Sequence, residues 1–174
     1  NWFTHSKKFA EHFEVYLIDQ RNHGQSPHSD DMNYRLLTED LARFISEHHL
    51  EKPMVLGHSM GGKTAMNFAI SHPADLSKLV VVDIMPKSYP VHHDHIIDGL
   101  MSIPVSQIES RNEADEILSK HVPELAVRQF LLKNLARNDA GGFEWKINLE
   151  ALNEHIEDLG AGLQYEGAFE GPTL

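Results

Sequence analysis

Hydrophobic positions in the first half of the chain follow two alternating patterns. Short apolar runs at 14–19, 54–56 and 79–83 predict buried strands. Apolar positions with a 3.6-residue period over 35–50 predict an amphipathic helix, and a second helix is expected over 60–71. Strands that alternate with helices at this spacing imply βαβ units and an α/β fold with a parallel sheet. In such sheets, ligands are expected at the carboxyl ends of the strands.

The pattern changes after Pro86. From Ile96 to about Leu159 the chain has helical periodicity and no convincing strand, so we predict a helical lid. One lid helix is expected to start near Asn148, which would be its cap. Its apolar stripe consists of Leu149, Leu152, Ile156 and Leu159.

Both ends of the sequence have the pattern of interrupted elements. Residues 172–174 resemble the start of a further strand, and residues 1–3 resemble the middle of a helix. We therefore expect a fragment that lacks both ends. It would comprise a partial core at 1–85, the lid at 86–162, and a return to the core with the start of the next strand at 163–174.

Composition and charge exclude several classes of partner. The 174 residues, 41% of them apolar, suffice for one packed core. The 15 basic and 26 acidic residues give a net charge of −11, which disfavours nucleic acid and anionic membranes. No stretch is apolar enough to predict a membrane span or a secretory signal, so a cytoplasmic location is the expectation. The absence of cysteine excludes disulfides and thiolate chemistry.

The strongest chemical signal is Gly57-His58-Ser59-Met60-Gly61, which fits the nucleophile motif G-x-S-x-G between a predicted strand and a predicted helix. Ser59 would occupy a sharp, strained turn, and Gly57 and Gly61 are expected to remove side chains that would collide with it. The Met60 N–H, at the helix N-terminus, would stabilise the oxyanion formed by attack on a carbonyl. The alternative is a glycine-rich turn with an incidental serine.

Three segments together resemble the α/β-hydrolase superfamily, and within it the YbfF-type small esterases. They are Asp19 to Ser26, Gly57 to Lys63, and Val82 to Pro86. The resemblance covers nearly the whole chain. It implies an α/β-hydrolase fold, with helices flanking the sheet, and a serine carboxylic-ester hydrolase that works through an acyl-enzyme. The implied partner is a small ester or thioester with a short or medium acyl chain, and no cofactor is implied.

The resemblance also implies the position of the other catalytic groups. Asp83 matches the acid at the end of the strand after the elbow helix, and Ser59 and Asp83 would end neighbouring parallel strands. Asp83 could instead cap a turn, with the acid lying after the next strand. The catalytic histidine is expected beyond Leu174, and the second oxyanion donor before Asn1.

Four side chains are candidates for substrate binding. His58 is next to the nucleophile and could contact substrate or simply pack. An acyl pocket between lid and sheet would be lined by Tyr89, Phe130 and Trp145, although core packing explains Phe130 equally well.

Two polar clusters are predicted to be structural. The His-rich run at 92–95 has metal-ligand atoms, but adjacent histidines on a helix point in different directions, so no metal site is predicted. Asp19, Arg21 and His23 form a charged turn that, in the resembling family, packs beside the nucleophile.

Two other functions are kept as alternatives. A lyase of menaquinone biosynthesis on the same fold also carries a Ser-Met-Gly-Gly elbow, and arginines in a pocket for an anionic substrate would favour it. A noncatalytic binding module on the hydrolase fold would be favoured if the full-length chain lacked a catalytic histidine. The sequence leaves the oligomeric state open.

Overall fold

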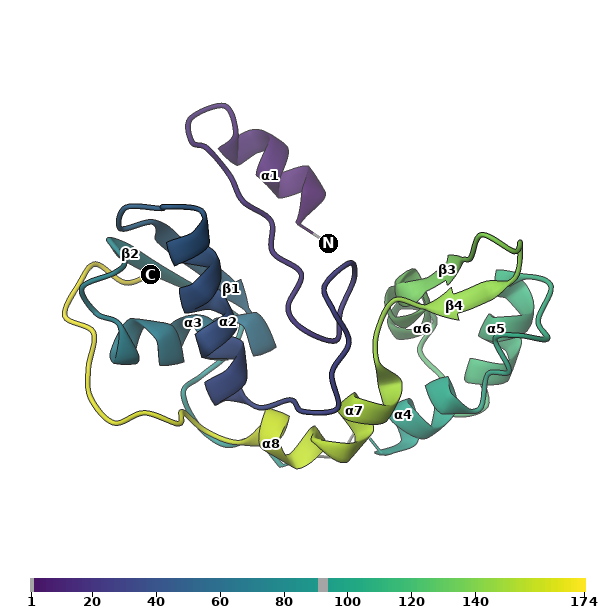
Figure 1. Ribbon diagram of the computed structural model, residues 1–174. Coiled ribbons are helices and arrows are strands. Elements are labelled where there is room, and N and C mark those ends of the chain that lie inside the picture. The colour runs from purple at the N-terminus through teal and green to yellow at the C-terminus, as the bar shows by residue number, and fades with distance from the viewer. Residues whose placement is uncertain (1, 91–93) are drawn as a thin grey trace.

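The computed structural model describes residues 2–90 and 94–174, and two groups of elements are visible in it (Figure 1). Helices α2 and α3 lie next to each other beside strands β1 and β2, the elements from α4 to β4 gather apart from them, and α7 and α8 run between the groups. No helix in these described ranges is long and apolar enough to span a membrane. The elements are α1 (Phe3–Phe9), α2 (Tyr34–Glu47), β1 (Met54–His58), α3 (Met60–Ser71), β2 (Lys78–Val82), α4 (Asp94–Met101), α5 (Arg111–Leu118), α6 (Leu125–Leu131), the 3₁₀ turn η1 (Leu132–Asn134), β3 (Leu135–Arg137), β4 (Phe143–Trp145), α7 (Leu149–Glu154) and α8 (Ile156–Gly160).

The sheet of the first group is parallel, as predicted. β1 pairs with β2 from Met54 opposite Lys78 onward. On the other side of β2, Thr173 forms a parallel bridge with Leu79, so the predicted strand at the end of the sequence is confirmed at its first residues. β2 therefore lies between two neighbours, whereas no described residue pairs with the outer edge of β1.

The predicted strand at 14–19 is wrong. The backbone there has no strand assignment, and the side chains of Tyr16, Leu17 and Ile18 are 40–46% exposed. An apolar run becomes a strand only when a neighbouring strand supplies ladder hydrogen bonds. Nothing in the described part of the chain pairs with this segment.

Helices α2 and α3 confirm the two helices predicted over 35–50 and 60–71. The Asn33 side chain caps α2 by accepting a hydrogen bond from the Leu36 N–H at 3.0 Å, and the helix ends at Glu47 rather than near residue 50. Helix α3 has the predicted bounds and packs against both strands and α2. Phe68 and Ala69 are fully buried in this core.

The residues predicted as a lid form a hydrophobic cluster of their own around the buried Leu118 and Leu135. The prediction of a lid without strands is wrong, because β3 and β4 form an antiparallel hairpin. Its turn is closed by Asn138, whose N–H donates to the Gly142 carbonyl at 3.0 Å. Strands of three residues are too short to display alternation, so the helical period of their surroundings hides them.

Helices α7 and α8 connect the two groups. The predicted cap is confirmed, since the Asn148 side chain accepts a hydrogen bond from the Ala151 N–H at 3.2 Å. The predicted single helix is divided, however, because His155 has non-helical backbone angles. Leu152 and Leu159 pack on a third buried cluster, which consists of Met32, Tyr34 and Leu37. The division into 1–85, 86–162 and 163–174 stays a prediction that these clusters support.

The polar turn after residue 19 joins core and lid. The buried Asn22, at φ 65°, accepts a hydrogen bond from the Asn148 N–H at 2.9 Å, and the Gly24 N–H donates to the Lys146 carbonyl at 2.6 Å. A Cβ at Gly24 would lie 2.1 Å from a carboxylate oxygen of Asp19. These contacts give the turn a structural role.

Candidate active site

Ser59 is the junction between β1 and α3, and its backbone is strained. Its φ of 52° and ψ of −121° lie in a region that L-residues rarely adopt. Hydrogen bonds hold both sides of the turn: the Ser59 N–H donates to the Val82 carbonyl at 3.1 Å, and the Lys63 N–H donates to the Ser59 carbonyl at 3.1 Å. The residue is exposed. The turn thus lifts one serine hydroxyl above the end of the sheet.

Two glycines permit this turn, and they are not the pair predicted. A Cβ at Gly57 would lie 2.1 Å from the Gly61 carbonyl oxygen, which confirms the prediction for Gly57. The prediction for Gly61 is wrong, because a Cβ there would meet no atom outside its own helix within 4 Å. Gly62 has the second steric role: its Cβ would lie 2.6 Å from the Ile84 side chain. We define the elbow as residues 57–62.

Met60 begins α3, where the first backbone N–H groups have no acceptor within the helix. The partial positive charge of the helix N-terminus therefore lies beside the Ser59 hydroxyl. The Met60 side chain points the other way and packs against the buried cluster that Leu152 and Leu159 also cover. The position of Met60 thus depends on α7 and α8 as well as on the elbow.

Asp83 immediately follows β2, next to the nucleophile in the sheet register. His58 is opposite Val82, so Ser59 and Asp83 are the next residues on neighbouring strands. Asp83 has a φ of 55°, and its side chain is 88% exposed. Its Oδ2 lies 3.8 Å from His58 Nε2, which is too long for a hydrogen bond. The sequence predicted that Ser59 and Asp83 end neighbouring strands, but the approach of His58 to Asp83 was not predicted, although the parallel register could have indicated it.

The three predicted pocket aromatics lie in different surroundings. Tyr89 accepts a hydrogen bond from the Met85 N–H at 3.0 Å, and its ring lies under the Lys63 ammonium. Trp145 lines a hollow of about 330 Å³ together with His28 and lid residues. Phe130 is 57% exposed on α6. The substrate-binding roles of these three residues and of His58 stay predictions.

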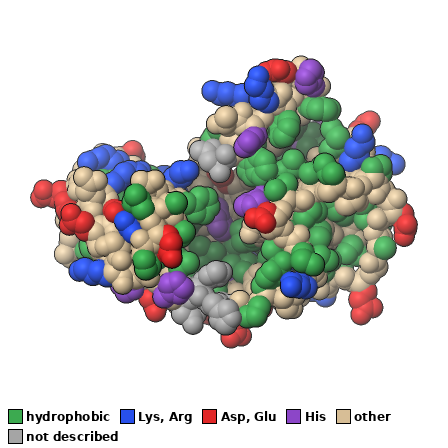
Figure 2. All heavy atoms as spheres, turned by 180° about the vertical axis from the view of Figure 1, so that it is seen from behind, with side chains coloured by type: hydrophobic (Ala, Val, Ile, Leu, Met, Phe, Trp, Pro, Cys, Tyr) green, Lys and Arg blue, Asp and Glu red, His purple; other side chains and the backbone are tan. Residues whose placement is uncertain are grey.

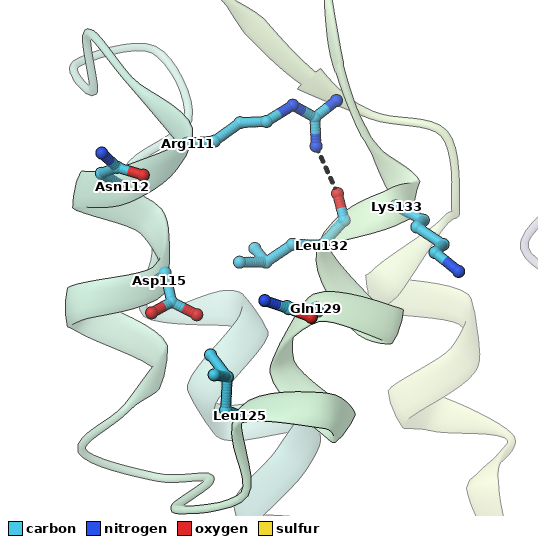
Figure 3. Close-up of a pocket in the computed structure, with 7 residues that line it drawn as sticks. All are labelled: Arg111, Asn112, Asp115, Leu125, Gln129, Leu132 and Lys133. Atoms are coloured by element: carbon cyan, nitrogen blue, oxygen red, sulfur yellow. Dashed lines mark hydrogen bonds between the residues drawn. The ribbon is translucent and has the colours of Figure 1, made fainter.

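Another hollow, of about 380 Å³, lies entirely within the lid (Figure 3). The Arg111 guanidinium beside it donates hydrogen bonds to the carbonyls of Leu132 and Leu135, the former at 2.6 Å. Seen from behind, the surface is also hollowed between lid and core, and hydrophobic side chains gather on the core side (Figure 2). The hollow of about 380 Å³ within the lid is lined by Arg111, Asn112, Asp115, Leu125, Gln129, Leu132 and Lys133.

No group of three or more acidic, histidine or cysteine side chains within 2–90 and 94–174 could hold a metal ion. The His-rich run falls partly outside these ranges, because His92 and His93 are not among the described residues.

Comparison with known proteins gives the family. Residues 1–105 match the family described as alpha/beta hydrolase fold. The chain belongs to the α/β-hydrolase fold family. It is 40% identical, over 92% of its own length, to the sn-1-specific diacylglycerol lipase ABHD11 of Danio rerio. It is 35% identical, over 92% of its length, to Esterase YbfF of Escherichia coli. The predicted resemblance to YbfF-type esterases is confirmed.

A solved structure, titled marine microorganism esterase, has the same fold with a TM-score of 0.94 and 40% identity. The match covers 99% of this chain and 69% of that one. Among the curated relatives, this chain spans 52% of the Danio rerio lipase and 61% of the Escherichia coli esterase. It therefore represents about half to two thirds of the length of these related proteins.

Proposed function

We propose that this chain carries the nucleophile of a serine carboxylic-ester hydrolase. The observation that carries the proposal is the strained, exposed Ser59 at the junction of β1 and α3. A serine held at φ 52° has little use in packing, whereas it suits attack on a carbonyl above the sheet. The esterase and lipase names of the relatives support the same activity.

The reaction passes through an acyl-enzyme. The Ser59 hydroxyl attacks the ester carbonyl while a histidine, expected beyond Leu174, takes its proton. The negative charge on the carbonyl oxygen is met by the Met60 N–H and by a second donor expected before Asn1. The histidine then protonates the leaving alcohol, and water hydrolyses the acyl-serine by the same steps. Asp83 orients the histidine and stabilises its protonated form.

The substrate class that we propose is a short or medium acyl ester or thioester. The lyase alternative needs arginines free to bind an anionic substrate. Three of the guanidinium groups are already engaged: Arg21 pairs with Asp40 at 2.6 Å, Arg111 binds carbonyls, and Arg128 pairs with Asp115 at 2.9 Å. This arrangement favours the esterase over the lyase.

The test uses the protein produced from its complete gene and a fluorophosphonate that labels activated serines. We expect one adduct, on Ser59, and hydrolysis of p-nitrophenyl acetate that Ser59→Ala abolishes. Folding should be unchanged, because the Ser59 side chain makes no capping hydrogen bond to α3. Ser77→Ala, at an exposed serine in the same half of the chain, is the control and should keep both labelling and activity. Activity retained in Ser59→Ala would contradict the proposal, and a wild-type protein without label or activity would favour the binding module.

A further inference from the structure

Lys63 is a buried lysine, and no described carboxylate pairs with its ammonium group. The residue is only 1% exposed and lies on α3, one turn after Ser59. Removing an ammonium from water is costly, and burial lowers the pKa of Lys63. Its charge must therefore be stabilised by dipoles fixed around it.

Those dipoles come from the end of α8 and from two aromatic rings. The Lys63 Nζ donates to the Gly160 carbonyl at 3.2 Å and also to the Ala161 carbonyl. It lies 5.4 Å from the ring centre of Tyr34 and 5.1 Å from that of Tyr89. A cation is favoured at a helix C-terminus, where carbonyls lack partners within the helix, and over the face of an aromatic ring.

Two further groups bind the same helix end, which we define as residues 159–161. The Tyr34 hydroxyl donates to the Leu159 carbonyl at 2.8 Å. The Tyr89 N–H donates to the Gly160 carbonyl at 2.8 Å. Each of the three successive carbonyls therefore accepts a hydrogen bond from outside α8. Lys63 donates two of these four bonds, and it is the only charged donor among them.

The helix end also contributes to the packing around Met60, the residue that follows Ser59. The Met60 side chain packs in the cluster that contains Tyr34, and Leu152 of α7 and Leu159 of α8 pack in the same cluster. A shift of α8 away from α3 would open this packing and free Met60 to move. The Lys63 N–H thus binds the Ser59 carbonyl, and the Lys63 ammonium group binds the helix end that supports the packing around Met60.

We propose that Lys63 is a positioning residue for the hydrolysis, which fixes the helix end 159–161 against α3 and so holds the Met60 N–H toward the oxyanion. The inference rests on the proposed ester hydrolysis at Ser59. Because the oxyanion forms only after attack, loss of this positioning lowers kcat while the binding of substrate, and with it KM, changes little.

Lys63→Met tests this in the protein produced from its complete gene, since methionine keeps an unbranched side chain and removes the charge. We expect kcat to fall about tenfold with KM within about twofold of the wild type. Amide deuterium uptake by the segment 156–165 should become about tenfold faster, because local opening is easier. Lys63→Arg keeps a cation with several donors and should recover much of kcat and of the protection.

Lys87→Met is the matched control. Lys87 also lies over the Tyr89 ring, at 5.3 Å, but it is exposed and none of its described contacts is with α8. Kinetics and deuterium uptake of this variant should equal those of the wild type. If Lys63→Met does not fold, Lys63→Gln replaces it, because glutamine is neutral and still donates hydrogen bonds.

The outcomes separate the two proposals. A wild-type protein whose Ser59 takes no fluorophosphonate would overturn the proposed function itself. If Ser59 is labelled but the neutral variant keeps both kcat and the slow uptake at 156–165, the role of Lys63 is wrong. A rise in KM at constant kcat would also overturn it, since that result would mean ground-state binding rather than positioning.

Discussion

Backbone contacts fix the elbow, whereas side chains fix the lid. At the elbow, Gly57 lets main-chain atoms approach where no Cβ fits, Gly62 leaves room for the Ile84 side chain, and Ser59 is held at positive φ by hydrogen bonds on both sides. The lid instead depends on a cluster of aliphatic side chains around Leu118 and Leu135. The elbow is therefore held by contacts that leave no space for a shift, whereas the side chains of the lid can repack.

The two regions differ in how they respond to an added atom. A close backbone approach has no flexible group that can yield, so an added methyl disturbs the whole turn. A side-chain cluster tolerates exchange of one apolar residue for another of similar volume. The proposed nucleophile therefore lies in the first kind of region, whose geometry is fixed, and the lid belongs to the second kind, which can change its packing.

The largest expected effect is on catalysis and comes from Asp83, beside the elbow. Asp83→Asn should lower kcat about 10⁴-fold, because the amide cannot stabilise a protonated histidine. The exposed side chain makes little contribution to packing, so folding should be unchanged. Steady-state kinetics on p-nitrophenyl acetate, with the melting temperature as control, measure this. A loss of less than about tenfold would move the catalytic acid beyond Leu174 and leave Asp83 as a turn residue.

The next largest effect is on stability, and it should differ between substitutions at the elbow glycines. Gly57→Ala should cost about 3 kcal/mol of unfolding free energy, because its Cβ would lie 2.1 Å from a backbone oxygen. Gly62→Ala should cost less, since the atom it meets first belongs to the Ile84 side chain, which can move.

Gly61→Ala is the control for both, because its Cβ points into open space. It should stabilise the protein by up to about 1 kcal/mol, since alanine is the better helix residue. Urea unfolding of the three variants checks the order. Equal losses at 57 and 61 would mean that the close approach at Gly57 is not what fixes the elbow.

The smallest effect is a pH dependence on the lid side. His155 Nδ1 lies 3.1 Å from Asp158 Oδ2, and this hydrogen bond raises the pKa of His155. The stabilisation is fully present below the unfolded pKa of about 6.5 and is lost as the pH rises through the higher folded value. It should be under about 1 kcal/mol, since surface pairs are screened. The free energy of unfolding in urea should be lower for His155→Gln than for the wild type, and the difference should be larger at pH 5.5 than at pH 8.5.

His23 gives the opposite sign and serves as the comparison. Burial lowers the pKa of His23, so its neutral form favours folding above about pH 6.5 and the protein loses stability as the pH falls below that value. His23→Gln should therefore reduce the loss of stability on the acid side. If both variants changed the pH profile in the same direction, the assignment of these two histidines would be wrong.

Much of the core could be predicted because its signals are local. Helix α3 has the predicted bounds since the G-x-S-x-G motif marks its start and Pro73 follows its end. The parallel pairing of β1 and β2 follows from the alternation of strands and helices. The segment 14–19 has an equally strong apolar run, yet it is no strand, because strand formation depends on a partner that the local pattern does not contain.

The candidate site could also be predicted only where its signals are local in the sequence. Ser59 follows from a motif, and the register then brings Asp83 beside it. Lys63 gave no signal, because its partners, Gly160 and Ala161, lie 97 and 98 residues away along the chain. A backbone carbonyl carries no mark in the sequence, so a lysine bound by carbonyls is indistinguishable from one in solvent.

The open edge of β1 has a consequence for the solution behaviour of this chain. Among the described residues β1 is paired on one side only, and Met54 and Leu56 on it are 45% and 38% exposed. An unpaired strand edge with apolar side chains is a template for another strand, including one from a second copy of the chain. In concentrated preparations this chain by itself would aggregate through that edge, and a charged residue at position 54 or 56 would delay it.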